Sequence, residues 1–169
     1  MTRIGMGFDV HRLVPDRDLW MCGVKIDHEL GLLGHSDADV GIHALCDALL
    51  GAANLRDIGY HFPDTDPKWK GADSRKLLAR VMQLLAEQGY TLGNCDITIC
   101  AERPKMNPHI PAMKQQLAAA MGCDESQISI KATTTERLGF TGREEGIAAY
   151  AVALIEQVAN HDSERIVQH

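Results

Sequence analysis

The sequence predicts a single domain that mixes α-helices with β-strands. Three observations lead to this prediction. Strand-like and helix-like apolar patterns follow one another along the chain, no internal repeat or long linker divides it, and 169 residues suit one domain with a sizeable core. A hydrophobic content of 45% with 24% charged residues is ordinary for a soluble globular protein, and an aromatic content of only 5% predicts an aliphatic core.

The first half of the chain is predicted to hold a strand, a hairpin and two helices. Residues 4–10 alternate apolar side chains with smaller or polar ones, and residues 17–27 alternate in a way that fits a hairpin. We expect a helix capped by Ser36 or Asp37 that runs to about Leu50. A second helix, from Ser74 or Arg75 to Gln88, is the clearest amphipathic one. The long polar connection over residues 57–73 is typical of a functional or mobile loop.

The second half is predicted to alternate strands with one helix. Residues 94–100 alternate as a strand, residues 101–109 form a proline-rich loop, and a helix opened by Pro111 ends near Gly122. A further strand contains Ile128 and Ile130. Residues 147–158 fit both patterns, and their alanine content favours a helix on pattern alone. We expect the domain to span residues 1–158 and the polar tail, residues 159–169, to be frayed.

Charge and cysteine content restrict the partners and the compartment. A formal net charge of −6 argues against a nucleic-acid binder, but it leaves room for a phosphorylated small substrate because bound divalent metals supply positive charge locally. The 5 cysteines are odd in number and show no Cys-x-x-Cys spacing, so we expect free thiols. No secretory signal or membrane-length apolar run is visible, which predicts a cytoplasmic protein without a membrane partner.

Asp9, His11 and His43 are candidate metal ligands. Residues two apart on a strand point to the same face, so Asp9 and His11 are expected to converge. His43 supplies a third ligand, and catalytic zinc takes three protein ligands while keeping a fourth position open. The alternative is a strand-end aspartate that caps a turn beside a surface histidine. Asp47, one helical turn after His43, either orients that imidazole or is solvated.

Six short motifs together resemble one enzyme family. They are GFDVH at 7–11, HSD at 35–37, FPDTD at 62–66, PKM at 104–106, TTTE at 133–136 and GFTGR at 139–143. In this order they resemble the 2-C-methyl-D-erythritol 2,4-cyclodiphosphate synthases of the non-mevalonate isoprenoid pathway, over about residues 3–155. The resemblance implies an α+β fold with a mixed four-stranded sheet, helices on one face, a chorismate-mutase-like arrangement and a homotrimer. On that basis we expect residues 147–155 to form a strand.

The resemblance also implies a reaction and its cofactors. A phosphorus–oxygen lyase of this family converts 4-diphosphocytidyl-2-C-methyl-D-erythritol 2-phosphate into the 2,4-cyclodiphosphate and CMP. Asp9, His11 and His43 match the ligands of one Zn²⁺ per subunit, and Glu136 matches the ligand of a second metal, Mg²⁺ or Mn²⁺. His35 and Thr134 match transition-state stabilisers. Without the resemblance, His35 reads as a solvated loop histidine and the threonine run as a strand preference.

The substrate site implied by the resemblance lies between subunits and draws on several segments. Its residues are Asp9, His11, His35, Ser36, Asp57, Ile58, Gly59, Phe62, Pro63, Asp64, Thr65, Asp66, Ala101, Glu102, Arg103, Pro104, Lys105, Met106, Asn107, Thr133, Thr134, Thr135, Glu136, Phe140 and Arg143. On sequence alone most of these segments are plain turn-rich or proline-rigid loops. The chain departs from many relatives at Met6, where they have His, and at Asn107, where they have an apolar residue; we expect binding to survive both.

Two further possibilities concern ligands and alternative functions. Relatives of the family carry isoprenoid diphosphates on the trimer axis, which implies a second site near Arg143 and Glu145; the alternative is that Arg143 pairs with a neighbouring glutamate. One competing function is a zinc hydrolase with Asp37 or Asp39 as general base. The other is a non-catalytic trimer that binds isoprenoid diphosphates and whose metal site is structural. A structural zinc normally has four ligands that include cysteine, whereas this site has three and no cysteine.

Overall fold

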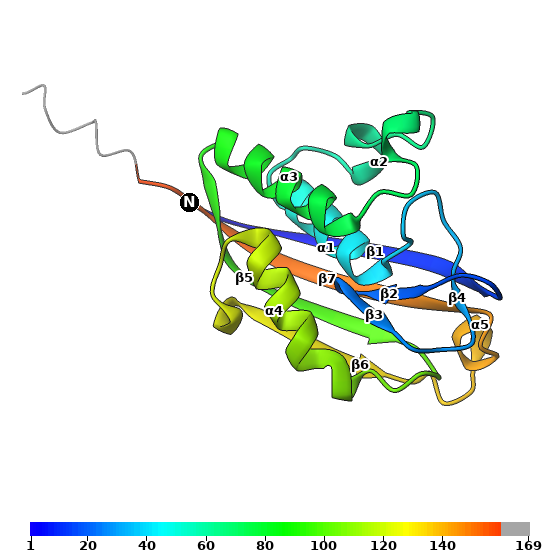
Figure 1. Ribbon diagram of the computed structural model, residues 1–169. Coiled ribbons are helices and arrows are strands. Elements are labelled where there is room, and N and C mark those ends of the chain that lie inside the picture. Colours follow the sequence, from blue (N-terminus) through cyan, green and yellow to red (C-terminus); the bar gives the residue numbers. More distant parts are fainter. Residues whose placement is uncertain (160–169) are drawn as a thin grey trace, which may run out of the picture.

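A mixed β-sheet with helices on one face forms the described part of the chain, residues 1–159, in the computed structural model (Figure 1). The strands are β1 Thr2–Val14, β2 Leu19–Met21, β3 Val24–Ile26, β4 Gly31–Leu32, β5 Tyr90–Cys100, β6 Ile128–Thr133 and β7 Gly146–Gln157. The α-helices are α1 Val40–Ala52, α2 Ile58–His61, α3 Ser74–Glu87, α4 Ile110–Met121 and α5 Gly139–Gly142. Short 3-10 turns are η1 Pro67–Trp69, η2 Asn107–His109 and η3 Glu125–Gln127.

The sheet has the strand order β4-β1-β7-β5-β6. Strand β7 pairs antiparallel with β1 on one side and with β5 on the other, and β6 runs parallel to β5 at the far edge. The predicted mixed sheet is therefore confirmed. Its predicted number of strands, four, is wrong, because the two-residue strand β4 adds a fifth through the pairs Leu13↔Leu32 and Val14↔Gly31. A strand this short shows no alternation in the sequence.

Helix α1 lies directly on the sheet because two strand residues lack side chains. A Cβ atom on Gly5 or Gly7 would overlap backbone atoms of Ala48 or Ala44 in α1. The small side chains of Ala149 and Ala151 in β7 are also fully buried, which lets α1 pack closely against β1 and β7. The close approach brings the helix that carries His43 against the strand that carries Asp9.

The element predictions are largely confirmed, with a correction at the start of α1. Residues 17–27 form the antiparallel hairpin β2–β3, and α3 and α4 lie where their patterns predicted. Ser36 and Asp37 do not cap α1, since the side chain of Asp39 accepts the N–H of Ile42. Asp39 is closer to the first turn of α1 and makes its cap. Helix α3 begins at Ser74, as predicted, after the N-cap Asp73.

The last described element is a strand, as the family resemblance implied and against the local pattern. The side chains of Ile147, Ala149, Ala151, Ala153 and Ile155 are buried, while Tyr150 and Val152 are exposed on the opposite face. Hydrogen bonding to β1 and β5 on both sides outweighs the helix propensity of its alanines. Strand β5 also begins four residues before the expected position 94, with an irregularity between Leu92 and Asn94. The predicted tail comprises residues 159–169, of which residues 160–169 lie outside the described part of the chain.

The face of the sheet opposite the helices carries exposed apolar side chains. Ile4, Met6, Phe8 and Val10 of β1 are between 42% and 72% exposed. Phe8 contacts Tyr150 of β7, with their ring centroids 4.9 Å apart. Phe8 and Val10 thus point away from Asp9 and His11, because neighbouring residues of a strand face opposite sides. A single chain leaves this apolar sheet face without cover.

Neither a membrane helix nor a disulfide occurs between residues 1 and 159. No helix in this part of the chain has the length and hydropathy needed to cross a bilayer. The 5 cysteines all lie there and are free, with Cys22, Cys46 and Cys95 buried. Burial raises the pKa of Cys22 and Cys46 well above the usual thiol value, so these two thiols stay protonated.

Candidate active site and metal centre

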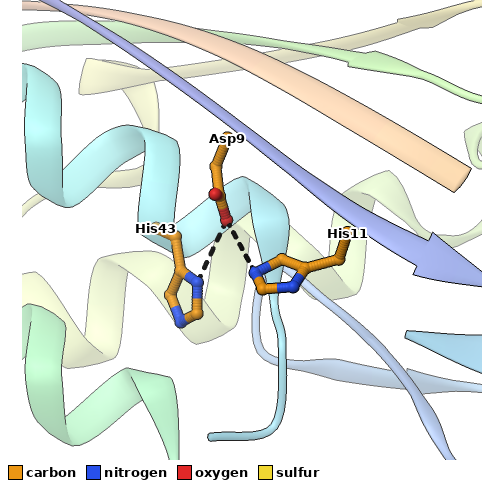
Figure 2. A group of neighbouring side chains, drawn as sticks. All are labelled: Asp9, His11 and His43. Atoms are coloured by element: carbon orange, nitrogen blue, oxygen red, sulfur yellow. Dashed lines mark hydrogen bonds and ion pairs between the residues drawn. The ribbon is translucent and has the colours of Figure 1, made fainter. Parts of the chain in front are cut away.

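Asp9, His11 and His43 converge on one point between β1 and α1 (Figure 2). Oδ2 of Asp9 lies 3.1 Å from Nε2 of His11 and 3.1 Å from Nδ1 of His43. One ligand atom from each of the three residues lies within 4.8 Å of the others. The three predicted ligands therefore lie close enough together to hold one metal ion, and the carboxylate of Asp9 contacts two imidazoles.

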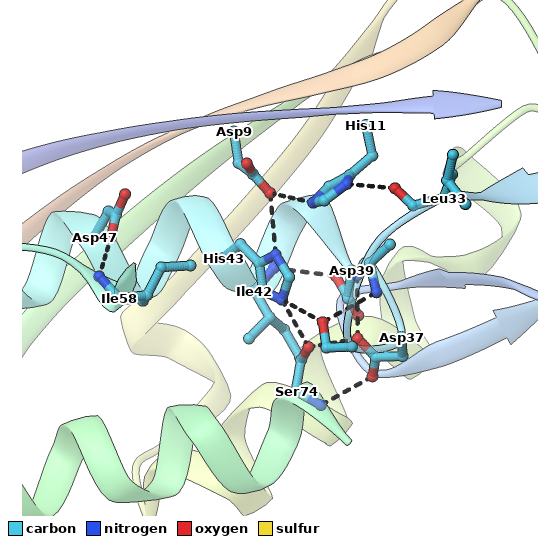
Figure 3. Close-up of polar contacts among 12 residues, drawn as sticks. Asp9, His11, Leu33, Asp37, Asp39, Ile42, His43, Asp47, Ile58 and Ser74 are labelled. Carbon is cyan, nitrogen blue, oxygen red and sulfur yellow. Dashed lines mark hydrogen bonds and ion pairs between the residues drawn. The ribbon is translucent and has the colours of Figure 1, made fainter. Parts of the chain in front are cut away.

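The second nitrogen of each imidazole is held by a fixed partner (Figure 3). Nδ1 of His11 lies 2.7 Å from the carbonyl oxygen of Leu33, to which it donates, so Nε2, the nitrogen that faces Asp9, is the one that a metal would bind in place of a proton. Nε2 of His43 contacts the hydroxyl oxygen of Ser74 at 2.9 Å and that of Ser36 at 3.2 Å. Asp47 does not orient His43, because its carboxylate accepts the N–H of Ile58 instead.

The electrostatics of the group favour an ionised Asp9. Burial raises the pKa of Asp9, but hydrogen bonds from His11 and His43 outweigh burial and lower it to about 2. Burial lowers the pKa of His11, yet its hydrogen bond and charge interaction with Asp9 raise the pKa above 6.5 overall. A carboxylate between two imidazoles is a site that attracts positive charge. Two nitrogen donors and one oxygen donor without cysteine fit a divalent metal centre with room for a further ligand.

A cavity of about 220 Å³ opens from these three residues. Several residues that the family resemblance implied line it, namely His35, Ser36, Ile58, Gly59, Phe62 and Asp64. Trp69 and Leu77 line it as well, and the sequence did not single them out. The Trp69 ring packs edge-on against Phe62 with ring centroids 4.9 Å apart. A tryptophan within a long polar loop was the available signal, since such a side chain needs an apolar partner.

A second cavity, of about 290 Å³, lies where the parallel strands β5 and β6 end. Most of the substrate-site residues expected over 101–107 line it; the full set is Ala101, Glu102, Pro104, Lys105, Met106, Asn107, Ala132, Thr133 and Thr134. Among the described residues, none lines both this cavity and the one beside His43. The departure at Asn107 therefore lies in a cavity wall, whereas Met6 lies on the open sheet face.

The side chain of Glu102 accepts hydrogen bonds from the loop that follows β6. Its Oε1 accepts the backbone N–H groups of Thr135 at 3.1 Å and Arg137 at 3.0 Å. Glu136 lies between them, exposed and in a left-handed conformation with φ of 53°. Within residues 1–159, the metal-ligand group of Asp9 does not include Glu136.

The other residues of the implied substrate site lie outside both cavities. Asp57 and Asp66 cap α2 and η1. Arg103 pairs with Glu29 and Glu144, and Arg143 pairs with Glu145. Pro63, Thr65, Thr135 and Phe140 line neither cavity.

The aspartates nominated as a hydrolytic base are occupied by other contacts. Asp39 is fully buried and accepts the N–H groups of Cys22, Gly23 and Ile42. Burial raises the pKa of Asp39, with the charge of Asp37 adding to it. Asp37 itself accepts both the hydroxyl and the backbone N–H of Ser74. Neither carboxylate lines the cavity beside the metal-ligand group, so the hydrolase alternative lacks its base.

The mixed sheet and the three converging side chains define an α+β protein with a group of residues that could hold a metal ion. The chain belongs to the YgbB family, which it matches over residues 2–156. It is similar to proteins named 2-C-methyl-D-erythritol 2,4-cyclodiphosphate synthase from several bacteria. The one from Parabacteroides distasonis is 67% identical over 158 residues, covering 94% of this chain and 98% of that protein. The one from Geobacter sulfurreducens is 63% identical over 155 residues, covering 92% and 99%.

Solved structures show the same fold. The bifunctional IspDF of Campylobacter jejuni matches 93% of this chain with a TM-score of 0.90 and 44% identity, and this chain spans 42% of that longer protein. A CDP-bound 2C-methyl-D-erythritol-2,4-cyclodiphosphate synthase matches 91% of this chain and all (100%) of its own, with a TM-score of 0.84 and 40% identity. The family implied by the six sequence motifs is confirmed.

Proposed function

We propose that the chain converts 4-diphosphocytidyl-2-C-methyl-D-erythritol 2-phosphate into 2-C-methyl-D-erythritol 2,4-cyclodiphosphate and CMP. An oxygen of the 2-phosphate attacks the β-phosphorus of the diphosphate, and the bond from that phosphorus to CMP breaks. The enzyme class is therefore a phosphorus–oxygen lyase of isoprenoid biosynthesis. The observation that carries the proposal is the group of Asp9, His11 and His43 at the mouth of a cavity with room for a small phosphorylated polyol. The CDP complex of a 40% identical relative adds support.

Asp9, His11 and His43 would hold one Zn²⁺ per subunit, and Glu136 would ligate Mg²⁺ or Mn²⁺ together with phosphate oxygens and water. Metals bound there supply the positive charge that two reacting phosphates need in order to approach. His35 and Ser36 line the cavity beside the ligand group and are proposed to position the 2-phosphate. Thr134 in the second cavity offers a hydroxyl to the diphosphate. Positioning and charge stabilisation are the main sources of rate in such a transfer.

The remaining substrate contacts divide between the two cavities. The methylerythritol end is assigned to the cavity lined by Ile58, Phe62 and Asp64. The cytosine end is assigned to the cavity lined by Met106 and Asn107, with Lys105 facing the phosphates. The residues of the implied site that lie outside both cavities are proposed to contact the substrate as well; they are Asp57, Pro63, Thr65, Asp66, Arg103, Thr135, Phe140 and Arg143.

A homotrimer with active sites between subunits is proposed for the assembly, in a chorismate-mutase-like arrangement. Two observations support it. The sheet face that carries Met6, Phe8 and Val10 is apolar and uncovered in one chain. The metal cavity and the cytosine cavity are separate in one chain, and an interface between subunits would bring the metal cavity of one to the cytosine cavity of its neighbour.

An isoprenoid diphosphate on the trimer axis is proposed near Arg143 and Glu145. In one chain, Nη2 of Arg143 lies 3.0 Å from Oε2 of Glu145, as the alternative expectation had it. Both side chains are more than half exposed, so the pair is weak and can exchange for a diphosphate.

Free thiols at all cysteines suit the cytoplasm, which is the proposed compartment. Residues 1–158 are proposed as one catalytic domain.

Phosphorus NMR of the purified protein with the cytidine-diphosphate substrate tests the reaction. We expect resonances of CMP and of a cyclic diphosphate to grow in the presence of Zn²⁺ and Mg²⁺. His43→Ala serves as the matched inactive protein. Release of inorganic phosphate would instead identify a hydrolase, and an unchanged spectrum would identify a binding protein.

A further inference from the structure

The second ring nitrogen of His43 is held by a buried hydroxyl group. Nε2 of His43 lies 2.9 Å from Oγ of Ser74, and Ser74 is 0% exposed. Ser74 is the first residue of α3, which follows the long loop over residues 57–73. Figure 3 shows Ser74 between His43 and Asp37, on the side of the imidazole away from Asp9.

The direction of these hydrogen bonds follows from the contacts of Asp37. The hydroxyl of Ser74 donates to Oδ1 of Asp37, and the backbone N–H of Ser74 donates to Oδ2 at 2.9 Å. A hydroxyl has one proton, so Oγ of Ser74 is left to accept from His43. Nε2 of His43 therefore carries a proton. Nδ1 lies 3.1 Å from Oδ2 of Asp9, and a metal that replaces the proton between these two atoms would be bound by the lone pair of Nδ1.

Asp37 is itself held in place by two further hydrogen bonds. The backbone N–H of Asp37 donates to the carbonyl oxygen of Ala72 at 3.2 Å, and Oδ1 of Asp37 also accepts the N–H of Asp39 at 3.1 Å. Ser36 contacts the same nitrogen of His43 at a longer distance of 3.2 Å, but its oxygen also accepts the N–H of Ala38. The better-placed acceptor for Nε2–H is thus Ser74.

We propose that Ser74 and Asp37 are positioning residues that orient His43 and fix its tautomer for metal binding. This inference rests on the proposed metal site. Neither residue belongs to the metal-ligand group, so both act through the imidazole. His11 has a backbone carbonyl in the equivalent role, whereas His43 depends on a side-chain relay that joins the metal site to the start of α3. Outer hydrogen bonds of this kind raise the basicity of a ligand and reduce its freedom to rotate.

Zinc affinity, measured by competition with a chromophoric chelator, tests the relay without the reaction. We expect Ser74→Ala to bind zinc about 10-fold to 100-fold more weakly than the wild type. Ser74→Thr keeps a hydroxyl and is expected to restore most of the affinity. The matched control is Asp73→Ala, which removes the N-cap of the same helix but has no contact with His43, and it is expected to keep wild-type zinc affinity.

The protonation of the His43 ring gives an independent readout on the folded wild type. With ¹⁵N-labelled histidine, the zinc-bound protein is expected to show a slowly exchanging Nε2–H resonance for His43. This resonance is expected to exchange faster in Ser74→Ala. Should that variant not fold, Asp37→Asn probes the relay from its other end and is expected to weaken zinc binding as well.

The outcomes separate this inference from the metal site itself. Zinc binding that depends on His43 but is equally tight in wild type and Ser74→Ala would overturn the relay and leave the metal site in place. A proton on Nδ1 of His43 in the zinc-bound wild type would overturn it too. A wild type whose zinc affinity does not differ from that of His43→Ala would remove both the metal site and the relay.

Discussion

Gly7 of β1 and Ala44 of α1 lie in direct backbone contact, so close that a Cβ atom at position 7 would overlap the carbonyl oxygen of Ala44. The contact is adjacent in sequence to His43 and two residues from Asp9. The separation of strand and helix at this point therefore sets the geometry of the metal-ligand group. A single backbone contact links the packing of the core to the chemistry of the site.

Replacement of Gly7 by alanine is expected to destabilise the protein and to weaken zinc binding. The added methyl group must push α1 away from β1, and overpacking of this kind costs about 1–3 kcal/mol. Urea unfolding and a zinc titration measure the two effects. The control is Gly51→Ala in the same helix, where a Cβ atom meets nothing within 4 Å. There we expect a gain of about 0.4–1 kcal/mol. Equal effects from the two substitutions would contradict the packing argument.

His43→Ala is expected to lose most bound zinc and the synthase activity while the assembly persists. Two ligands remain, and two ligands hold zinc far less tightly than three. Elemental analysis after gel filtration measures the zinc content, and the elution volume reports the assembly. His109→Ala, outside the ligand group, is the control with full zinc content expected. Full zinc content in His43→Ala would remove that residue from the site.

Mixed oligomers of Lys105→Ala and His43→Ala subunits are expected to regain activity. Lys105 lines the cytosine cavity and His43 the metal cavity, so an interface between two different subunits can combine one intact copy of each. The measurement requires that each variant alone is inactive. Activity is followed by CMP release after co-refolding, with mixed assembly verified by two affinity tags. An inactive preparation with verified mixing would argue for sites within single chains.

Geranyl or farnesyl diphosphate is expected to bind the assembly in a manner that depends on Arg143. Three copies of Arg143 around an axis repel one another, and a diphosphate matches their planar donors. Calorimetry on the wild type and on Arg143→Ala measures the loss of binding. Arg137→Ala, an exposed arginine of the same segment, is the control. Binding that is unchanged in Arg143→Ala would refute the axial site.

The metal-free protein is expected to gain stability from the Asp9–His11 pair between about pH 4 and pH 6.5. The pKa of Asp9 falls from 3.8 to about 2, so its contribution is complete above pH 3.8 and lost as the pH falls through about 2. The pKa of His11 rises above 6.5, so its contribution is complete below pH 6.5 and lost as the pH rises through the folded value. Thermal unfolding of wild type and His11→Asn in chelator, compared across pH, measures the difference. A difference that is constant from pH 2 to pH 9 would contradict the pairing.

Much of the site was predictable because it depends on short-range periodicity. Asp9 and His11 lie two apart on a strand, which places them on one face, and the apolar spacing of residues 74–88 specifies an amphipathic helix. The hairpin over residues 17–27 follows from the same alternation. The six motifs then implied the family, which the comparisons confirm.

Other features depend on residues that are far apart in the chain. The segment from 146 to 157 is a strand because β1 and β5 pair with it on both sides, although its alanines favour a helix locally. The acceptor for His43 is Ser74, 31 residues away, rather than Asp47 one turn along the same helix. Local sequence therefore determined which side chains are available and which face of each element they occupy. Only the tertiary structure decided their partners, because strand pairing and buried hydrogen bonds form between segments that meet after the chain has closed long loops.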